Sequence, residues 1–109
     1  MLLKLKNSEK FLKDGFTAYV YNSKEEYPKL NVVYVDCFLD HEKVYVKKSH
    51  RLYFVIDGSG VFNVGNDKYN VGKNDVIVIE PTVEYSYKGK MKLFEVNFPA
   101  TSSEDEVKI

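Results

Sequence analysis

From Phe16 onward, short runs of apolar and β-branched residues alternate with turn-forming residues. The runs cover residues 16–21, 31–39, 44–46, 52–56, 61–64, 68–71, 76–79, 84–87 and 91–98. Runs of this length at near-regular spacing, bounded by Gly, Pro, Asn and Asp, are typical of strands in a sandwich or barrel. The pattern therefore predicts an all-β fold, in which 31–39, apolar on both faces, lies between two packed layers.

Glycine and proline mark where these strands are expected to end. The segments 57–60, 65–67 and 88–90 each contain glycine with small or polar residues, and they predict tight turns between neighbouring strands. Pro81 ends the strand over 76–79, because proline cannot donate to a β-ladder, and Pro99 ends the last strand.

The two ends of the chain differ from this β pattern. Ser8 offers an N-cap, and residues 9–13 followed by Gly15 predict one or two helical turns near the N-terminus. Residues 1–100 are expected to form a single barrel domain. The segment 101–109 is small and acidic, and it is expected to be a mobile tail.

Composition and charge narrow the function classes. Nine Tyr, seven Phe and no Trp favour strands. Sixteen basic residues balance sixteen acidic ones, so no basic face of the kind found in nucleic-acid binders is expected. No apolar stretch approaches the roughly 20 residues of a membrane helix, and no signal peptide is visible, so a cytoplasmic location without membrane partners is expected. The zero net charge permits self-association. The only cysteine, Cys37, is expected to be buried.

Two segments in the second half of the chain carry a family-like spacing. Gly58 lies in a Val-Ile-Asp-Gly-Ser-Gly phrase, and Asn74, Asp75 and Pro81 follow in the second segment. These residues resemble the two strand-pair motifs of the cupin superfamily, in its small single-domain, RmlC-like form, over roughly 43–99. The resemblance implies a cupin-type double-stranded β-helix, or jelly-roll barrel, with at most one short N-terminal helix.

In the cupin family, two histidines and a glutamate of the first motif and a histidine of the second bind a divalent metal. By position, the glutamate becomes Arg51 and the second-motif histidine becomes Tyr85. The histidine pair falls on 44 and 46 or on 45 and 47, which are Val, Val, Tyr and Lys. A guanidinium cannot coordinate a cation and repels one. No metal and no other cofactor is therefore expected, which puts the family's metal-dependent chemistry in doubt.

The two histidines are the remaining candidates for chemistry. His50 precedes Arg51, so strand alternation sends the two side chains to opposite faces, and His50 points outward if Arg51 points into the barrel. His41 lies in an Asp-His-Glu segment that predicts a turn. Both histidines are therefore expected on the surface.

Four residues are expected to bind a ligand inside the barrel: Arg51, Tyr53, Tyr85 and Tyr87. A cationic fork with phenolic hydroxyls suits a carboxylate, a phosphate or a sugar. In the alternative interpretation, Arg51 pairs with Asp57 or Glu95 and the tyrosines simply fill the barrel. The sequence leaves both interpretations open, and it identifies no catalytic residue.

The sequence thus predicts a metal-independent cupin that binds a small polar or anionic ligand and forms a homodimer. One alternative is a small cupin enzyme, either a metal-dependent dioxygenase or a sugar isomerase or epimerase. Epimerases of this fold use a histidine base and a tyrosine acid, so His41 or His50 inside the barrel mouth would favour that alternative. The other alternative is a non-catalytic structural or dimerisation module.

Overall fold

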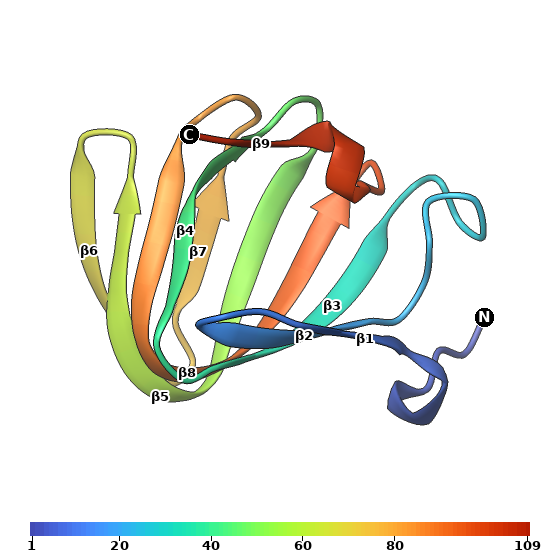
Figure 1. Cartoon of the computed structure of the whole chain (residues 1–109), viewed down its shortest axis with the longest axis horizontal. Coiled ribbons are helices and arrows are strands. Elements are labelled where there is room, and N and C mark those ends of the chain that lie inside the picture. The colour runs from blue at the N-terminus through green and yellow to red at the C-terminus, as the bar shows by residue number, and fades with distance from the viewer.

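The computed structural model describes all of residues 1–109 and is almost entirely β-structure (Figure 1). Its elements, in chain order, are η1 (Leu5–Asn7), β1 (Glu9–Leu12), β2 (Phe16–Val20), β3 (Asn31–Cys37), β4 (Asp40–Val46), β5 (His50–Val64), β6 (Asp67–Gly72), β7 (Val76–Ile79), β8 (Tyr85–Phe98), η2 (Ser103–Asp105) and β9 (Glu106–Lys108). The two η elements are single 3-10 turns. The all-β prediction is confirmed.

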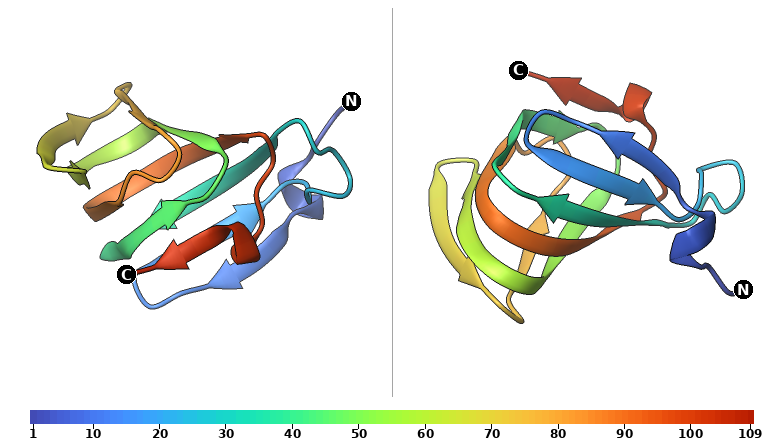
Figure 2. Two further views of the ribbon diagram at one scale, coloured as in Figure 1. Left: turned by 90° about the horizontal axis from the view of Figure 1, so that it is seen from above. Right: turned by 60° about the horizontal axis from the view of Figure 1, so that its bottom comes forward.

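Two long strands, β5 and β8, organise the barrel. They pair antiparallel from His50↔Phe98 to Val64↔Tyr85. The first half of β5 also pairs with β7, and the second half of β8 with β3, which gives one sheet in the order β7-β5-β8-β3-β2-β1. The other halves continue into a second sheet in the order β6-β5-β8-β4-β9. The two sheets curl toward each other as the jelly roll that the sequence predicts (Figure 2).

The turns predicted at 57–60 and 88–90 are bends inside these long strands, so this part of the prediction is wrong. At the bend, β5 and β8 approach so closely that side chains do not fit. A Cβ added to Gly60 would lie 2.3 Å from the carbonyl oxygen of Lys88, and one added to Gly89 would lie 2.6 Å from the Cα of Gly60. The glycines mark a close approach of two backbones rather than a reversal of the chain.

The helix predicted over 9–13 is also wrong. Glu9–Leu12 is strand β1, which pairs antiparallel with β2. All four of its residues are exposed in this strand. A helix of one or two turns is hard to nucleate, whereas pairing with the open edge of β2 supplies ladder hydrogen bonds.

The C-terminal segment, expected to be a mobile tail, is docked on the barrel. The side chain of Asn31 donates to the carbonyl of Thr101 at 3.2 Å and accepts from its amide at 3.1 Å. Lys24 contacts Asp105 at 3.0 Å. Beyond this contact, β9 pairs with β4 and lies across one end of the barrel (Figure 1). These anchors lie about 70 or more residues away along the chain, so local composition could not reveal them.

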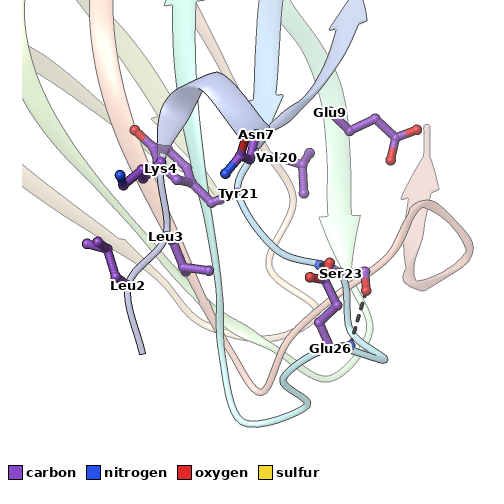
Figure 3. Close-up of a pocket in the computed structure, with 9 residues that line it drawn as sticks. All are labelled: Leu2, Leu3, Lys4, Asn7, Glu9, Val20, Tyr21, Ser23 and Glu26. Atoms are coloured by element: carbon purple, nitrogen blue, oxygen red, sulfur yellow. Dashed lines mark hydrogen bonds between the residues drawn. The ribbon is translucent and has the colours of Figure 1, made fainter.

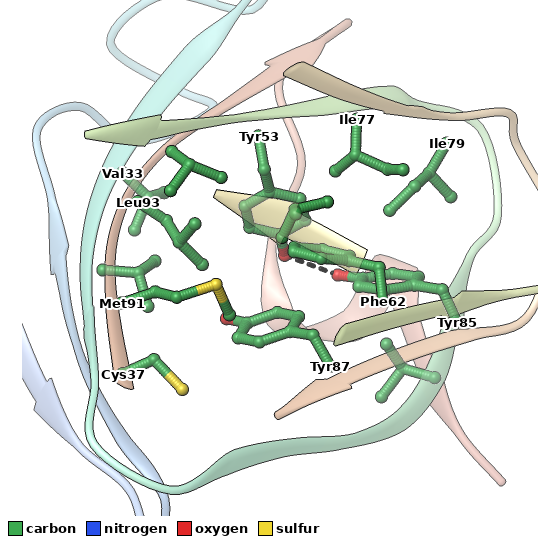
Figure 4. Close-up of a cluster of buried hydrophobic side chains, with 14 residues drawn as sticks. Val33, Cys37, Tyr53, Phe62, Ile77, Ile79, Tyr85, Tyr87, Met91 and Leu93 are labelled. Carbon is green, nitrogen blue, oxygen red and sulfur yellow. Dashed lines mark hydrogen bonds between the residues drawn. The ribbon is translucent and has the colours of Figure 1, made fainter. Parts of the chain in front are cut away.

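The core lies between the two sheets and is made of inward-facing side chains, many of them aromatic (Figure 4). Cys37 is fully buried, as the sequence predicts, and burial raises the pKa of its thiol. A neutral buried thiol packs as a small apolar group. The helical elements are single turns, far too short to span a membrane.

Candidate functional site

Arg51 is the centre of a buried polar cluster. It points inward from β5 and is 3% exposed. Its Nε donates to the side-chain oxygen of Asn97. One terminal nitrogen donates to the hydroxyl of Tyr85 at 2.6 Å and to Glu106 at 2.9 Å. The other lies 3.6 Å from a carboxylate oxygen of Glu95. Two carboxylates therefore neutralise the guanidinium, and a ligand is not needed to do so.

The two carboxylates affect the pKa of Arg51 more strongly than its burial does. Burial alone would lower the pKa of Arg51, but the charges of Glu95 and Glu106 and the neighbouring tyrosines raise it well above its usual value. Arg51 is thus a permanent cation. Of the two partners that the sequence suggests, Glu95 is the observed one, and Glu106 was not foreseen.

Three buried tyrosines continue this cluster into the barrel, and one of them lacks a polar partner. The hydroxyls of Tyr53 and Tyr85 are hydrogen-bonded at 2.7 Å (Figure 4). The hydroxyl of Tyr87 is buried and has no hydrogen-bond partner. Burial raises the pKa of all three phenols, so they are neutral donors. An unpaired buried hydroxyl costs about 1–3 kcal/mol, so the hydroxyl of Tyr87 is free to donate to a bound polar group.

His41 is buried inside the barrel end, contrary to the surface position predicted for it. It lies on β4 and is 7% exposed. Its Nδ1 lies 2.7 Å from the carbonyl oxygen of Glu42, so Nδ1 carries a proton and donates it there. The ring stacks on Phe16 at 4.7 Å between centroids and lies 5.0 Å from the ring of Tyr87. In the neutral ring, Nε2 is therefore a free acceptor.

A β-bulge explains why the sequence misplaces His41. Val44 and Val46 point inward, so strict alternation would turn residue 41 outward. The pairing of β4 with β8 shifts register between His41 and Val44, and this irregularity returns His41 to the inner face. No pattern in the sequence predicts the bulge.

Glu106 is the second member of the site that the sequence misses. It lies at the start of β9, in the segment expected to be mobile. One carboxylate oxygen binds Arg51, and the other lies 4.0 Å from Nε2 of His41. The side chain of Glu106 is 26% exposed, whereas those of Arg51 and His41 are below 10%. The cluster therefore reaches solvent beside Glu106.

His50 takes no part in this cluster. As predicted, it lies on the face of β5 opposite Arg51, where it pairs with Glu80 at 3.0 Å and stacks on Phe98 at 5.4 Å. His41 is thus the one histidine in the barrel interior.

Two of the cavities at the surface bear on the search for a ligand site. One, of about 240 Å³, is lined by Asp40, His41, Glu42, Lys43, Asn63, Ser86, Tyr87 and Lys88. The other, of about 330 Å³, lies beside the N-terminal segment and is lined by Leu2, Leu3, Lys4, Asn7, Glu9, Val20, Tyr21, Ser23 and Glu26 (Figure 3). Of the four residues expected to bind a ligand, only Tyr87 lines either cavity, and it does so together with His41.

The residues at the metal-binding positions of the cupin motifs do not fit a metal ion. Arg51 stands where a glutamate ligand would be, and its donors are committed to Glu95 and Glu106. Tyr85, at the second-motif histidine position, accepts a hydrogen bond from this guanidinium. No group of three or more His, Cys, Asp or Glu side chains is arranged to hold a metal ion.

Replacing single tyrosine hydroxyls should separate structural from ligand-binding roles. Tyr85→Phe removes an acceptor of Arg51, so we expect unfolding free energy to fall by about 1–3 kcal/mol. Tyr87→Phe removes a hydroxyl that has no protein partner, so stability should be unchanged or slightly higher. Urea unfolding of the two variants checks this prediction. A loss for Tyr87→Phe equal to that for Tyr85→Phe would show that Tyr87 has a structural partner.

Comparison with known proteins gives a clear structural likeness. No protein-family model matches the chain, and no curated protein sequence does. A variant of Pac13 from Streptomyces with a histidine replaced by glutamine, solved with uridine, superposes with a TM-score of 0.91 at 27% identity, over 99% of this chain and 89% of that one. Pac13 is described as a β-barrel and a nucleoside dehydratase. Two variants of Pac13 with a tyrosine replaced by phenylalanine were likewise solved with uridine.

Two more distant structures share the fold alone. A protein from Planctomyces limnophilus has a TM-score of 0.87 at 17% identity, over 98% of this chain and 95% of that one. The oxalate decarboxylase of Bacillus subtilis, a protein with Mn(II) centres, has a TM-score of 0.84 at 14% identity. This chain covers only 31% of the decarboxylase.

Proposed function

Because the chain belongs to the cupin superfamily, we propose that it binds a nucleoside or a related sugar derivative beside His41 and eliminates water from it. The observation that carries this proposal is the pair formed by His41 and Glu106. Both Nε2 of His41 and the facing oxygen of Glu106 are acceptors, and the 4.0 Å between them is too long for a hydrogen bond. Two neighbouring hydroxyls, such as those of a ribose, supply the two missing donors.

The likeness to Pac13 supports this choice of ligand. Pac13 was solved with uridine, and the residue types varied in it are one histidine and tyrosines. The same types meet in the present barrel, where His41 lies beside Tyr87 and close to Tyr85. The unpaired hydroxyl of Tyr87 provides one further donor for a polar ligand.

Elimination of water requires that a proton is removed from carbon and that a proton is delivered to the departing oxygen. In the proposed reaction, Nε2 of His41 takes a proton from a carbon next to an electron-withdrawing group. The C–H electron pair becomes the new double bond, the neighbouring C–O bond breaks, and water leaves. The carboxylate of Glu106 lies 4.0 Å from Nε2 of His41. It stabilises the imidazolium that exists between removal of the first proton and its delivery to the leaving oxygen.

The proton for the leaving hydroxyl comes from His41 in this proposal. Tyr87 is a poor source, because burial raises the pKa of its phenol well above the usual value. Tyr87 instead donates a hydrogen bond and orients the ligand. His41 thus acts first as base and then as acid, with its Nδ1–H fixed by the carbonyl of Glu42.

The buried position of His41 also favours a second reaction, epimerisation of a sugar carbon. That reaction begins with the same proton removal but returns a proton to the opposite face of the carbon. The two reactions are separated by running them in deuterium oxide. Mass spectrometry detects elimination as the loss of one water from the nucleoside. Epimerisation loses no water and instead adds one deuterium at the inverted carbon.

The first test is ligand binding. We expect uridine to bind the full chain and to perturb the NMR signals of the His41 ring, and we expect 2′,3′-dideoxyuridine to bind at least tenfold more weakly. The dideoxy compound is the matched control, because it keeps the base and lacks only the two hydroxyls. Equal binding of the two nucleosides, or no binding of uridine at millimolar concentration, would contradict the proposed donor pair.

A further inference from the structure

The C-terminal end of the chain lies on the outside of the barrel beyond a firm anchor. The chain is fixed as far as Thr101, whose backbone makes two hydrogen bonds with the buried side chain of Asn31, at 3.1 and 3.2 Å. Residues 102–109, which we call the strap, follow this anchor and include no buried residue. The strap consists of η2 and β9 and crosses one end of the barrel (Figure 1).

The contacts that hold the strap are mostly polar and lie at the surface. Lys24, whose side chain is 39% exposed, contacts Asp105. Lys108 contacts Glu42 at 3.2 Å, and both of these side chains are more than half exposed. Exposed ion pairs of this kind contribute little to stability.

The strand of the strap is short and lies at an edge. β9 forms a ladder of three residue pairs with β4, and one further backbone hydrogen bond lies at each end of this ladder. Because β9 is the last strand of its sheet, it can separate from β4 without breaking any other strand pairing. Segments with few buried contacts open locally at a much lower free energy than the core.

The strap covers the polar cluster around Arg51. Glu106 points inward from β9, where it binds Arg51 at 2.9 Å and faces Nε2 of His41 at 4.0 Å. Arg51 and His41 are 3% and 7% exposed, and Tyr53 and Tyr85 are at most 1% exposed. A ligand therefore cannot reach these groups while the strap is in place.

The cavity beside Asp40 does not replace this route. It is lined by His41 and Tyr87, but Arg51, Tyr53 and Tyr85 are not among its lining residues. A ligand in that cavity stays outside the polar cluster, so access to the cluster requires another opening.

We propose that the strap is a lid, which moves away from β4 to admit the ligand and closes again to bring Glu106 to His41. The inference rests on the proposed function for the identity of the ligand. The hinge is Ser102, which directly follows the anchored Thr101 and has an extended backbone. The amide and hydroxyl of Ser102 donate to Asp105 inside the strap, so η2 moves as one piece with β9.

Arg51 favours the closed position of the lid. Opening removes Glu106 from the guanidinium and leaves Glu95, 3.6 Å away, as its remaining carboxylate partner. A buried cation with an unused N–H donor is costly, and the charge-assisted hydrogen bond to Glu106 removes that cost on closure. A ligand with hydroxyls that bridge His41 and Glu106 holds the lid closed and keeps water out during the reaction.

A disulfide that locks the strap tests this proposal. Tyr45 of β4 and Val107 of β9 lie directly opposite each other, at a Cα separation that a disulfide bridges. The variant Tyr45→Cys with Val107→Cys is locked by oxidation with diamide and released by dithiothreitol. The matched control, Lys10→Cys with Tyr19→Cys, joins β1 to β2 in the same way. The native Cys37 is fully buried.

Reaction of the two histidines with diethyl pyrocarbonate reports opening without any nucleoside. We expect His41 to react slowly in the reduced strap variant and at least tenfold more slowly after oxidation. His50 lies on the outer face, so it should react at the same rate in both states and serves as the internal reference. The control disulfide should leave both rates unchanged. Peptide mass spectrometry measures the rates.

A single substitution tests the opposite direction. Lys24→Ala removes one anchor of the strap, so the rate at which His41 reacts should rise severalfold. Lys10→Ala removes a lysine from β1, outside the strap and its contacts, and should leave this rate unchanged. Circular dichroism confirms that each variant is folded.

Uridine binding gives the second readout. Oxidation of the strap variant should slow the association of uridine at least tenfold, as measured by surface plasmon resonance, and oxidation of the control should not. If the reactivity of His41 changes as expected while uridine binds to no form of the protein, the lid is supported and the proposed ligand is wrong.

Three results would overturn the lid. His41 could fail to react in the reduced variant and in Lys24→Ala, which would show that the strap stays closed. His41 could react equally in the reduced and oxidised states, which would place the route of entry at the cavity beside Asp40. The locked protein could bind uridine as fast as the reduced protein, which would contradict the lid and leave the proposed function intact.

Discussion

Arg51→Met should lower the free energy of unfolding by roughly 3–5 kcal/mol. The substitution keeps most of the apolar stem and removes the charge that neutralises Glu95 and Glu106. Two carboxylates then face each other across the barrel end without a cation, and the hydroxyl of Tyr85 loses its donor. Urea denaturation at neutral pH measures the loss.

The control for this prediction lies one residue earlier on the same strand. His50→Ala removes a partly exposed contact with Glu80 and should cost less than about 1 kcal/mol. Adding Glu95→Gln and Glu106→Gln to Arg51→Met should recover part of the stability, because the unpaired charges are then gone. If Arg51→Met costs no more than His50→Ala, the buried cation is not a structural centre of this barrel.

His41→Gln should lower the rate of water elimination by about 100- to 10,000-fold, the range found for removal of a general acid–base group. Glutamine preserves hydrogen bonding and much of the volume of the ring, but it cannot take up a proton. Uridine binding should therefore change by only a few-fold. The two quantities come from product formation by mass spectrometry and from calorimetric titration of the same variant.

His50→Gln provides the matched control, since it makes the same substitution on the outer face of the barrel. It should leave the rate of elimination within about twofold of the wild type. Glu106→Gln should give an intermediate loss, because it weakens the field on the imidazolium without removing the base. Unchanged elimination in His41→Gln would exclude His41 as the base and would assign the proton transfer to another group.

The sequence by itself determined most of the architecture. The runs of strand-forming residues predicted an all-β sandwich or barrel, and alternation placed Arg51 with Tyr53, and Tyr85 with Tyr87, on shared strand faces. The resemblance to cupins supplied the barrel and the inward direction of these faces. The same alternation placed their neighbours, such as His50, on the opposite faces of these strands. These features depend on local periodicity, which each strand carries in its own residues.

The path of the chain at the bends was decided only by the tertiary structure. Gly60 and Gly89 have the composition of turn residues whether the chain reverses or two strands cross closely. Only the approach of β5 to β8 distinguishes the two cases. The same holds for β1, which became a strand because the edge of β2 was open to it.

The chemistry of the site also depended on the tertiary structure. A bulge in β4 turned His41 inward, and the docking of the last nine residues brought Glu106 to Arg51 from 55 positions away. Neither event has a local signal, because a bulge is a property of the pairing with β8 and docking is a property of distant anchors such as Asn31. The sequence thus determined the fold and the phase of its strands. The tertiary structure decided which charged groups meet, because those contacts join segments that are far apart along the chain.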